Sequence, residues 1–190
     1  KRSHEDYVQI KYEEHHISST ISCVALIPDV DIILLFPLDY MHLVCLGVTK
    51  KLISLWLNTG PTNVRLPSWK IKNITSSLNK IKKCITNDFA RKPRAIEEFK
   101  RFKATEFRQF LLYTGPVVLK NILPDDCYQH FMVFSVSLRI LLSSKQSSKY
   151  LNYAQNLLEY FVERFQQIYG CHFISHNIHG LLHLVDDYHL

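Results

Sequence analysis

Residues 31–58 read DIILLFPLDYMHLVCLGVTKKLISLWLN, and this stretch decides the expected fold. It begins with five apolar residues at positions 32–36, bounded by Asp31 and Pro37. A short apolar run with such boundaries is typical of a strand buried on both faces. After Pro37 the apolar residues recur at steps of three and four, as on the buried face of a helix. That face comprises Met41, Val44, Val48, Leu52, Leu55 and Trp56. The sequence therefore predicts a strand over residues 31–36 and a helix over residues 41–58.

Asp39 lies between the predicted strand and the predicted helix. A carboxylate at this point is open to the region beyond the strand ends, where α/β sheets bind their ligands. His42 follows three residues later, so one helical turn brings the two side chains to the same side. Asp39 is therefore a candidate catalytic residue, with His42 as a candidate catalytic partner. The alternative is that Asp39 only caps the helix, which is a common role for Asp.

Three blocks of sequence, in order, resemble segments of CACTA-type transposases and their domesticated relatives. PLDYMHLVCLGV (residues 37–48), followed by KKLISLW, resembles the region around the second catalytic aspartate of that family. RKPRAIEEFKRFKATEFRQFLLYTGPVVLKNILP (residues 91–124) resembles its helical region, and FISHNIHGLLHLVDD (residues 173–187) resembles the segment before its last acidic residue. The three blocks follow the order of the family and together extend over most of the chain, which therefore resembles an internal fragment of a DDE-type transposase.

The resemblance implies a fold that is mainly α with a small β component. Residues 1–60 would form a partial ribonuclease H-like α/β core, interrupted by a helical insertion over residues 61–170. Residues 171–190 would form a His-rich helix that leads back to the core.

The resemblance also implies DDE chemistry, in which three carboxylates hold two Mg²⁺ ions for cleavage and transfer of DNA strands. Of the three carboxylates only Asp39 is identified, and the others are expected before Lys1 and after Leu190. We therefore expect the isolated chain to be inactive, as a fragment or a domesticated remnant. The expected partner is DNA, either transposon ends or host DNA, with a homo-oligomer and a nuclear location as further expectations.

Composition predicts one domain, or a large part of one, with a sizeable core, because 47% of the 190 residues are hydrophobic. No apolar run reaches the length that spans a membrane, and the first residues lack the core of a signal peptide. Five scattered cysteines without a CxxC pair favour a reducing compartment. These features predict an intracellular protein with no membrane partner.

Positive charge is concentrated in one part of the chain. Between Arg65 and Arg108 there are thirteen Lys or Arg residues against four Asp or Glu, although the net charge of the whole chain is only +6. Such a segment suits the phosphate backbone of DNA. The candidate DNA-binding residues are Lys82, Lys83, Arg91, Lys92, Arg94, Lys100, Arg101 and Lys103. The alternative is that they are the solvated faces of amphipathic helices.

The same region contains regularly spaced aromatic residues, which either stack on nucleobases or belong to the core. They are Phe99, Phe102, Phe107 and Phe110, and a core role is favoured. Glu106 interrupts this aromatic pattern and is a candidate structural ion-pair partner for a neighbouring Arg or Lys. Residues 128–142 are apolar nearly all round, which predicts the buried centre of the insertion.

The end of the chain is rich in histidine. It contains His172, His176, His179, His183 and His189, flanked by Asp186 and Asp187. On one helix the first four would form a stripe, and pairs spaced by four residues can share a metal ion. We interpret His179 and His183 as lining a cleft, with structural histidines or a zinc site as alternatives. Two other function classes thus remain open: a non-catalytic DNA- or protein-binding module, and a helical metalloprotein using the His172–His183 stripe.

Overall fold

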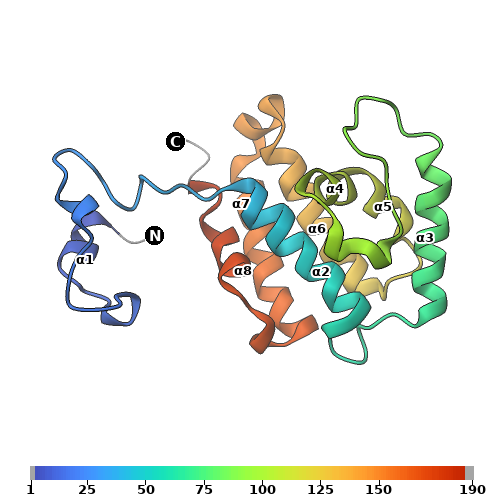
Figure 1. Ribbon diagram of the computed structural model, residues 1–190, viewed down its shortest axis with the longest axis horizontal. Helices are drawn as coiled ribbons and strands as arrows, with labels where there is room; N and C mark the ends of the chain where they lie inside the picture. Colours follow the sequence, from blue (N-terminus) through green and yellow to red (C-terminus); the bar gives the residue numbers. More distant parts are fainter. Residues whose placement is uncertain (1–2, 187–190) are drawn as a thin grey trace.

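The computed structural model describes residues 3–186. The protein is 66% helical, and residues 3–186 contain no strand and no sheet. The prediction of a partial ribonuclease H-like α/β core interrupted by a helical insertion is therefore wrong. The helical content expected for the insertion extends over the whole of the molecule's body (Figure 1).

The helices follow one another along the chain, with the longest connections over residues 27–40 and 83–95. The α-helices are α1 (His4–Val8), α2 (Lys50–Ser54), α3 (Ser68–Lys82), α4 (Ala104–Gln109), α5 (Gly115–Val118), α6 (Asp125–Leu141), α7 (Ser144–Tyr169) and α8 (His176–Gly180). The 3-10 helices are η1 (Glu13–His15), η2 (Cys23–Leu26), η5 (Ile96–Arg101), η7 (Cys171–Phe173) and η8 (Leu181–His183). The π-helical stretches are η3 (Met41–Thr49), η4 (Leu55–Thr59) and η6 (Phe110–Thr114). Because η3, α2 and η4 are continuous, we call them together the central helix.

The predicted strand at residues 31–36 is a turn instead. The Asp31 side chain accepts hydrogen bonds from the backbone N–H groups of Ile33 (2.8 Å) and Leu34 (3.0 Å). The Asp31 carbonyl accepts a further bond from Leu35 N–H at 2.9 Å. An Asp side chain that binds nearby N–H groups offers the backbone an alternative to strand pairing. The apolar run is not buried on both faces either, because Phe36 is 67% exposed.

Residues 3–36 form a small unit that lies to one side of the helical body (Figure 1). It is held by hydrogen bonds from Ser22 N–H to the Tyr7 hydroxyl (3.2 Å) and from Ile32 N–H to His4 Nδ1 (3.2 Å). The extended hydrophobic core includes none of its residues and begins at Leu43. Residues 3–60 therefore contain no sheet on which a ribonuclease H-like core could be built.

The predicted helix over residues 41–58 is confirmed as the central helix. Five of the six residues on its predicted apolar face are buried: Val44, Val48, Leu52, Leu55 and Trp56. Met41, at the start of the helix, is 43% exposed. The central helix packs within the body formed by α3 to α8 (Figure 1).

The long helices α6 and α7 pair with each other, and their contact supplies the aromatic centre of the core. His130 of α6 stacks on Phe161 of α7 with ring centroids 4.0 Å apart, and Phe134 lies 4.7 Å from the same ring. The prediction that residues 128–142 form a buried centre is confirmed. The core role favoured for the aromatic residues of the basic region is also confirmed, because Phe99, Phe102, Phe107 and Phe110 are all buried.

The single His-rich helix predicted over residues 171–190 is wrong over the part that the structure describes. Helix α7 ends at Tyr169 and is followed by Gly170, whose φ of +100° favours glycine. Three short pieces follow instead, namely η7, α8 and η8. Asp187 and His189 lie outside the described residues. The backbone changes direction at Gly170, and α8 then packs against the first part of the central helix. One straight helix over residues 171–186 would not make this contact.

Candidate nucleic-acid interface

Seven of the eight candidate DNA-binding side chains are exposed around α3, η5 and the connection between them. They are Lys82, Lys83, Arg91, Lys92, Lys100, Arg101 and Lys103. Within residues 3–186 none of these seven side chains takes part in an ion pair. An exposed cation without an acidic partner keeps its full charge available for a phosphate group.

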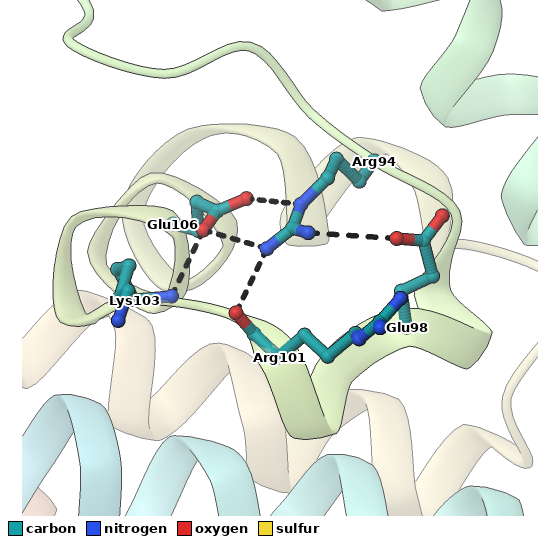
Figure 2. Close-up of polar contacts among 5 residues, drawn as sticks. All are labelled: Arg94, Glu98, Arg101, Lys103 and Glu106. Atoms are coloured by element: carbon teal, nitrogen blue, oxygen red, sulfur yellow. Dashed lines mark hydrogen bonds and ion pairs between the residues drawn. The ribbon is translucent and has the colours of Figure 1, made fainter.

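Arg94 is the exception, because acidic residues of its own chain hold its guanidinium. Its Nε donates to Glu106 Oε1 at 2.7 Å and its NH2 group donates to Glu106 Oε2 at 3.0 Å (Figure 2). It also donates to the Arg101 carbonyl at 2.9 Å and lies 3.5 Å from Glu98. The prediction of Glu106 as an ion-pair partner is confirmed. We therefore leave Arg94 out of the interface and assign it a structural role.

Glu106 is buried, with only 4% of its surface exposed. Burial alone raises the pKa of a carboxyl group, but the Arg94 guanidinium and the Lys103 backbone N–H (2.9 Å) both stabilise the charged form. The net result is a pKa of Glu106 below its ordinary value. The pair fixes the segment before α4 onto that helix, and so positions the exposed cations on either side of Arg94.

Two further lysines, Lys72 and Lys80, extend this basic region along α3. Together with Lys83 they line a shallow hollow of about 370 Å³, whose other lining residues are Thr75, Ser76 and Asn79. Both lysines belong to the basic segment between Arg65 and Arg108, but they are not among the eight candidate DNA-binding residues. Their position opposite the buried Ile74 and Leu78 was the signal that would have found them.

Asp39 lies at the start of the central helix. Its Oδ1 accepts a hydrogen bond from Met41 N–H at 2.7 Å, and its carbonyl accepts one from Leu43 N–H at 2.8 Å. Its Oδ2 is paired with His42 Nδ1. The hydrogen bond from His42, followed by that from the Met41 N–H, lowers the pKa of Asp39. These contacts match the capping alternative, and the side chains of both residues are more than half exposed.

His179 and His183 are neighbours, with ring centroids 5.3 Å apart. His183 Nδ1 lies 3.7 Å from Asp186 Oδ2. Burial, with the adjacent His179, lowers the pKa of His183 despite the nearby Asp186. Their segment packs on the start of the central helix, since a Cβ atom at Gly180 would lie 2.9 Å from Leu43 Cδ1.

The residues present do not fit a magnesium site of the DDE kind. Such a site needs several carboxylates that converge on the ions. Over residues 3–186 no group of three or more His, Cys, Asp or Glu side chains is arranged to hold a metal ion. Among the described residues, Asp39 therefore has no carboxylate partner for such a site, and His179 and His183 do not form a group of three ligands with any neighbour.

Comparisons of the chain with protein-family models, with curated proteins and with solved structures found no match. Across residues 3–186, no helix combines the length and the apolar character needed to cross a lipid bilayer.

Proposed function

We propose that this chain is a helical part of a DDE-type DNA transposase, or of a domesticated protein derived from one, and that it binds DNA without cleaving it. The observation that carries the proposal is the set of exposed, unpaired cations on α3, η5 and the connection between them. Phosphate groups attract such cations through charge and through release of counterions. The resemblance to CACTA-type transposases supports DNA as the polyanion.

The arrangement favours contact with the DNA backbone over recognition of bases. Lysine and arginine side chains bind phosphate without regard to sequence. The aromatic residues of the same region, such as Phe99 and Phe107, are buried in the core and so are withheld from base stacking. We therefore expect binding that depends on salt and little on DNA sequence.

Fluorescence anisotropy with a labelled DNA duplex tests the proposal. The double variant Lys82→Glu/Lys83→Glu reverses two charges at the end of α3, and Lys145→Glu/Lys149→Glu reverses two exposed charges at the start of α7 as a matched control. We expect the first variant to weaken binding by tenfold or more, and the control by less than about threefold. Equal losses in both variants, or no binding by the wild type, would overturn the proposal.

The nuclear location and the homo-oligomer expected from the resemblance belong to the same proposal. Imaging of the tagged protein in cells tests the first, and light scattering of the purified protein tests the second. A cytoplasmic signal would contradict the nuclear location. A monomer at micromolar concentration would contradict the homo-oligomer.

A second candidate is strand cleavage by a longer protein that includes this chain. The half-exposed Asp39 carboxylate, beside His42 and near the segment that carries His179 and His183, favours it. The test is cleavage of transposon-end DNA with Mg²⁺ or Mn²⁺ by a protein extended at both ends. Activity should vanish in Asp39→Ala and persist in the control Asp88→Ala, whereas activity that survives Asp39→Ala excludes Asp39 from the reaction.

A further inference from the structure

We propose that a lysine-lined groove on the central helix holds the phosphates of a single nucleic-acid strand that continues from the basic surface of α3. The proposal rests on the proposed function. It adds a second binding site, which takes an unpaired strand and not a duplex. The groove measures about 690 Å³. It is lined by residues of the central helix, of η5 and of the segment over residues 173–177.

The groove gathers positive charge from two separate parts of the sequence. Lys50 and Lys51 belong to the central helix, and Lys100 belongs to η5, about fifty residues later. The lining contains no Asp or Glu. Three ammonium groups around one hollow without a carboxylate form a site for an anion. The Ser54 and Thr59 hydroxyls share a hydrogen bond of 3.2 Å, so one of the two, together with the Ser175 hydroxyl, adds hydrogen-bond donors for phosphate oxygens.

Asn177 gives the groove a polar wall that depends on a glycine in the central helix. A Cβ atom at Gly47 would lie 2.5 Å from Asn177 Nδ2 and 2.7 Å from the His42 carbonyl oxygen. The absence of a side chain at position 47 therefore lets the amide of Asn177 lie directly against the helix. Within residues 3–186 this amide makes no hydrogen bond to the protein, so its donors and acceptor are available to a ligand.

Phe173 provides an apolar surface beside the charge. Its ring is half-buried, and Lys51 Nζ lies 5.7 Å from the ring centroid. Grooves that bind single strands combine such cations with aromatic side chains. A duplex is too wide to enter a hollow of this size, whereas the sugar, base and phosphate of an unpaired nucleotide fit one.

The groove and the hollow on α3 adjoin η5 from its two sides. Lys100 of η5 lines the groove, while Ile96 N–H at the start of η5 donates to Thr75 Oγ1, which lines the hollow on α3 (3.1 Å). Figure 1 shows this segment between the central helix and α3. A strand bound on α3 would reach the groove by crossing η5, where Glu98 is paired with Arg94 and the exposed Glu97 accepts a hydrogen bond from the Thr75 hydroxyl.

Three labelled probes test the proposal by anisotropy: a blunt duplex, the same duplex with a single-stranded thymidine tail, and the thymidine strand alone. The wild type should bind the tailed duplex about tenfold more tightly than the blunt duplex. Lys50→Gln/Lys51→Gln should abolish this gain and leave blunt-duplex binding within about twofold. Gly47→Ala, which displaces Asn177, should reduce the gain without changing any charge.

Failure of this inference is separable from failure of the proposed function. If the blunt duplex binds but the tail adds nothing, or if the groove variant weakens both duplexes equally, the groove site is overturned alone. If no DNA probe binds, the proposed function fails as well. Displacement of the tail by a phosphoserine peptide at a lower concentration than by the thymidine strand would also overturn the inference. Circular dichroism melting of each variant confirms that it is folded.

Discussion

Trp56 and Tyr169, which are 113 positions apart in the sequence, share a buried hydrogen bond. Trp56 Nε1–H donates to the Tyr169 hydroxyl oxygen at 3.1 Å, and both residues are almost fully buried. Burial raises the pKa of Tyr169 well above its ordinary value. The bond joins the central helix to the end of α7, so it ties the two elements around which the body is built.

Removal of this hydroxyl group should destabilise the body. Tyr169→Phe leaves the Trp56 N–H buried without a partner, which costs about 2 kcal/mol. Urea denaturation followed by tryptophan fluorescence measures the free energy of unfolding. The control Tyr160→Phe removes an exposed hydroxyl group from the same helix and should change stability by less than about 0.5 kcal/mol. An equal effect in the two variants would contradict the role of the bond.

Glu106→Gln should destabilise the protein by about 2 kcal/mol at pH 7, because it removes the charge that pairs with Arg94. The pKa of Glu106 is depressed below 4.5, so its contribution is complete above that pH and is lost as pH falls through the folded-state pKa. The difference between wild type and variant should therefore shrink below pH 4.5.

Glu98→Gln provides the matched control for Glu106→Gln. Glu98 faces the same guanidinium at 3.5 Å, but 44% of its side chain is exposed. Pairs of this kind contribute little, so its loss should change stability by less than about 0.5 kcal/mol. Denaturation over a pH series measures both variants, and similar losses would contradict the assignment of Glu106 as the main partner.

His130 should make the free energy of unfolding depend on pH between about 4 and 6.5, a higher range than that of Glu106. Its Nε2 bonds to the Phe161 carbonyl at 2.9 Å, its Nδ1 is buried without a partner, and burial lowers its pKa to about 4. The folded state keeps the ring neutral while the unfolded state binds a proton below pH 6.5. Stability should therefore fall by about 3 kcal/mol between pH 6.5 and pH 4.

The variant His130→Phe should lose that pH dependence, because a Phe ring keeps the stacking on Phe161 and does not titrate. Denaturation at half-unit pH intervals measures the slope. The exposed His176 serves as a control, since His176→Phe should leave the slope of the wild type unchanged. A slope that persists in His130→Phe would assign the dependence to other groups.

Local periodicity was sufficient to predict the central helix and several core positions of the body. The apolar spacing at Val44, Val48 and Leu52 identified the central helix, and the aromatic spacing at Phe107 and Phe110 identified core positions. A buried helical face repeats every three to four residues, so one sequence contains the whole signal. The Arg94–Glu106 pair was predicted in part, because its acidic member interrupts an otherwise aromatic pattern.

The errors arose where distant or competing contacts decide the structure. The apolar run of residues 32–36 has strand composition, but the Asp31 side chain turns the backbone and no second strand is present in the described chain. The His-rich stripe required one straight helix, whereas the segment is divided into η7, α8 and η8, with Ile174 and Ser175 extended between the first two. The groove joins Lys50, Lys100 and Asn177, which no local pattern in the sequence connects.

The salt dependence of binding to a DNA duplex tests the central claim most directly. The logarithm of the association constant should fall linearly with the logarithm of KCl concentration, with a slope of about −0.9 for each phosphate contacted. The account predicts that Lys82→Glu/Lys83→Glu makes this slope shallower by about 2, and that Lys145→Glu/Lys149→Glu leaves it unchanged. A slope that is the same in the wild type and in Lys82→Glu/Lys83→Glu would contradict a DNA-binding surface on α3.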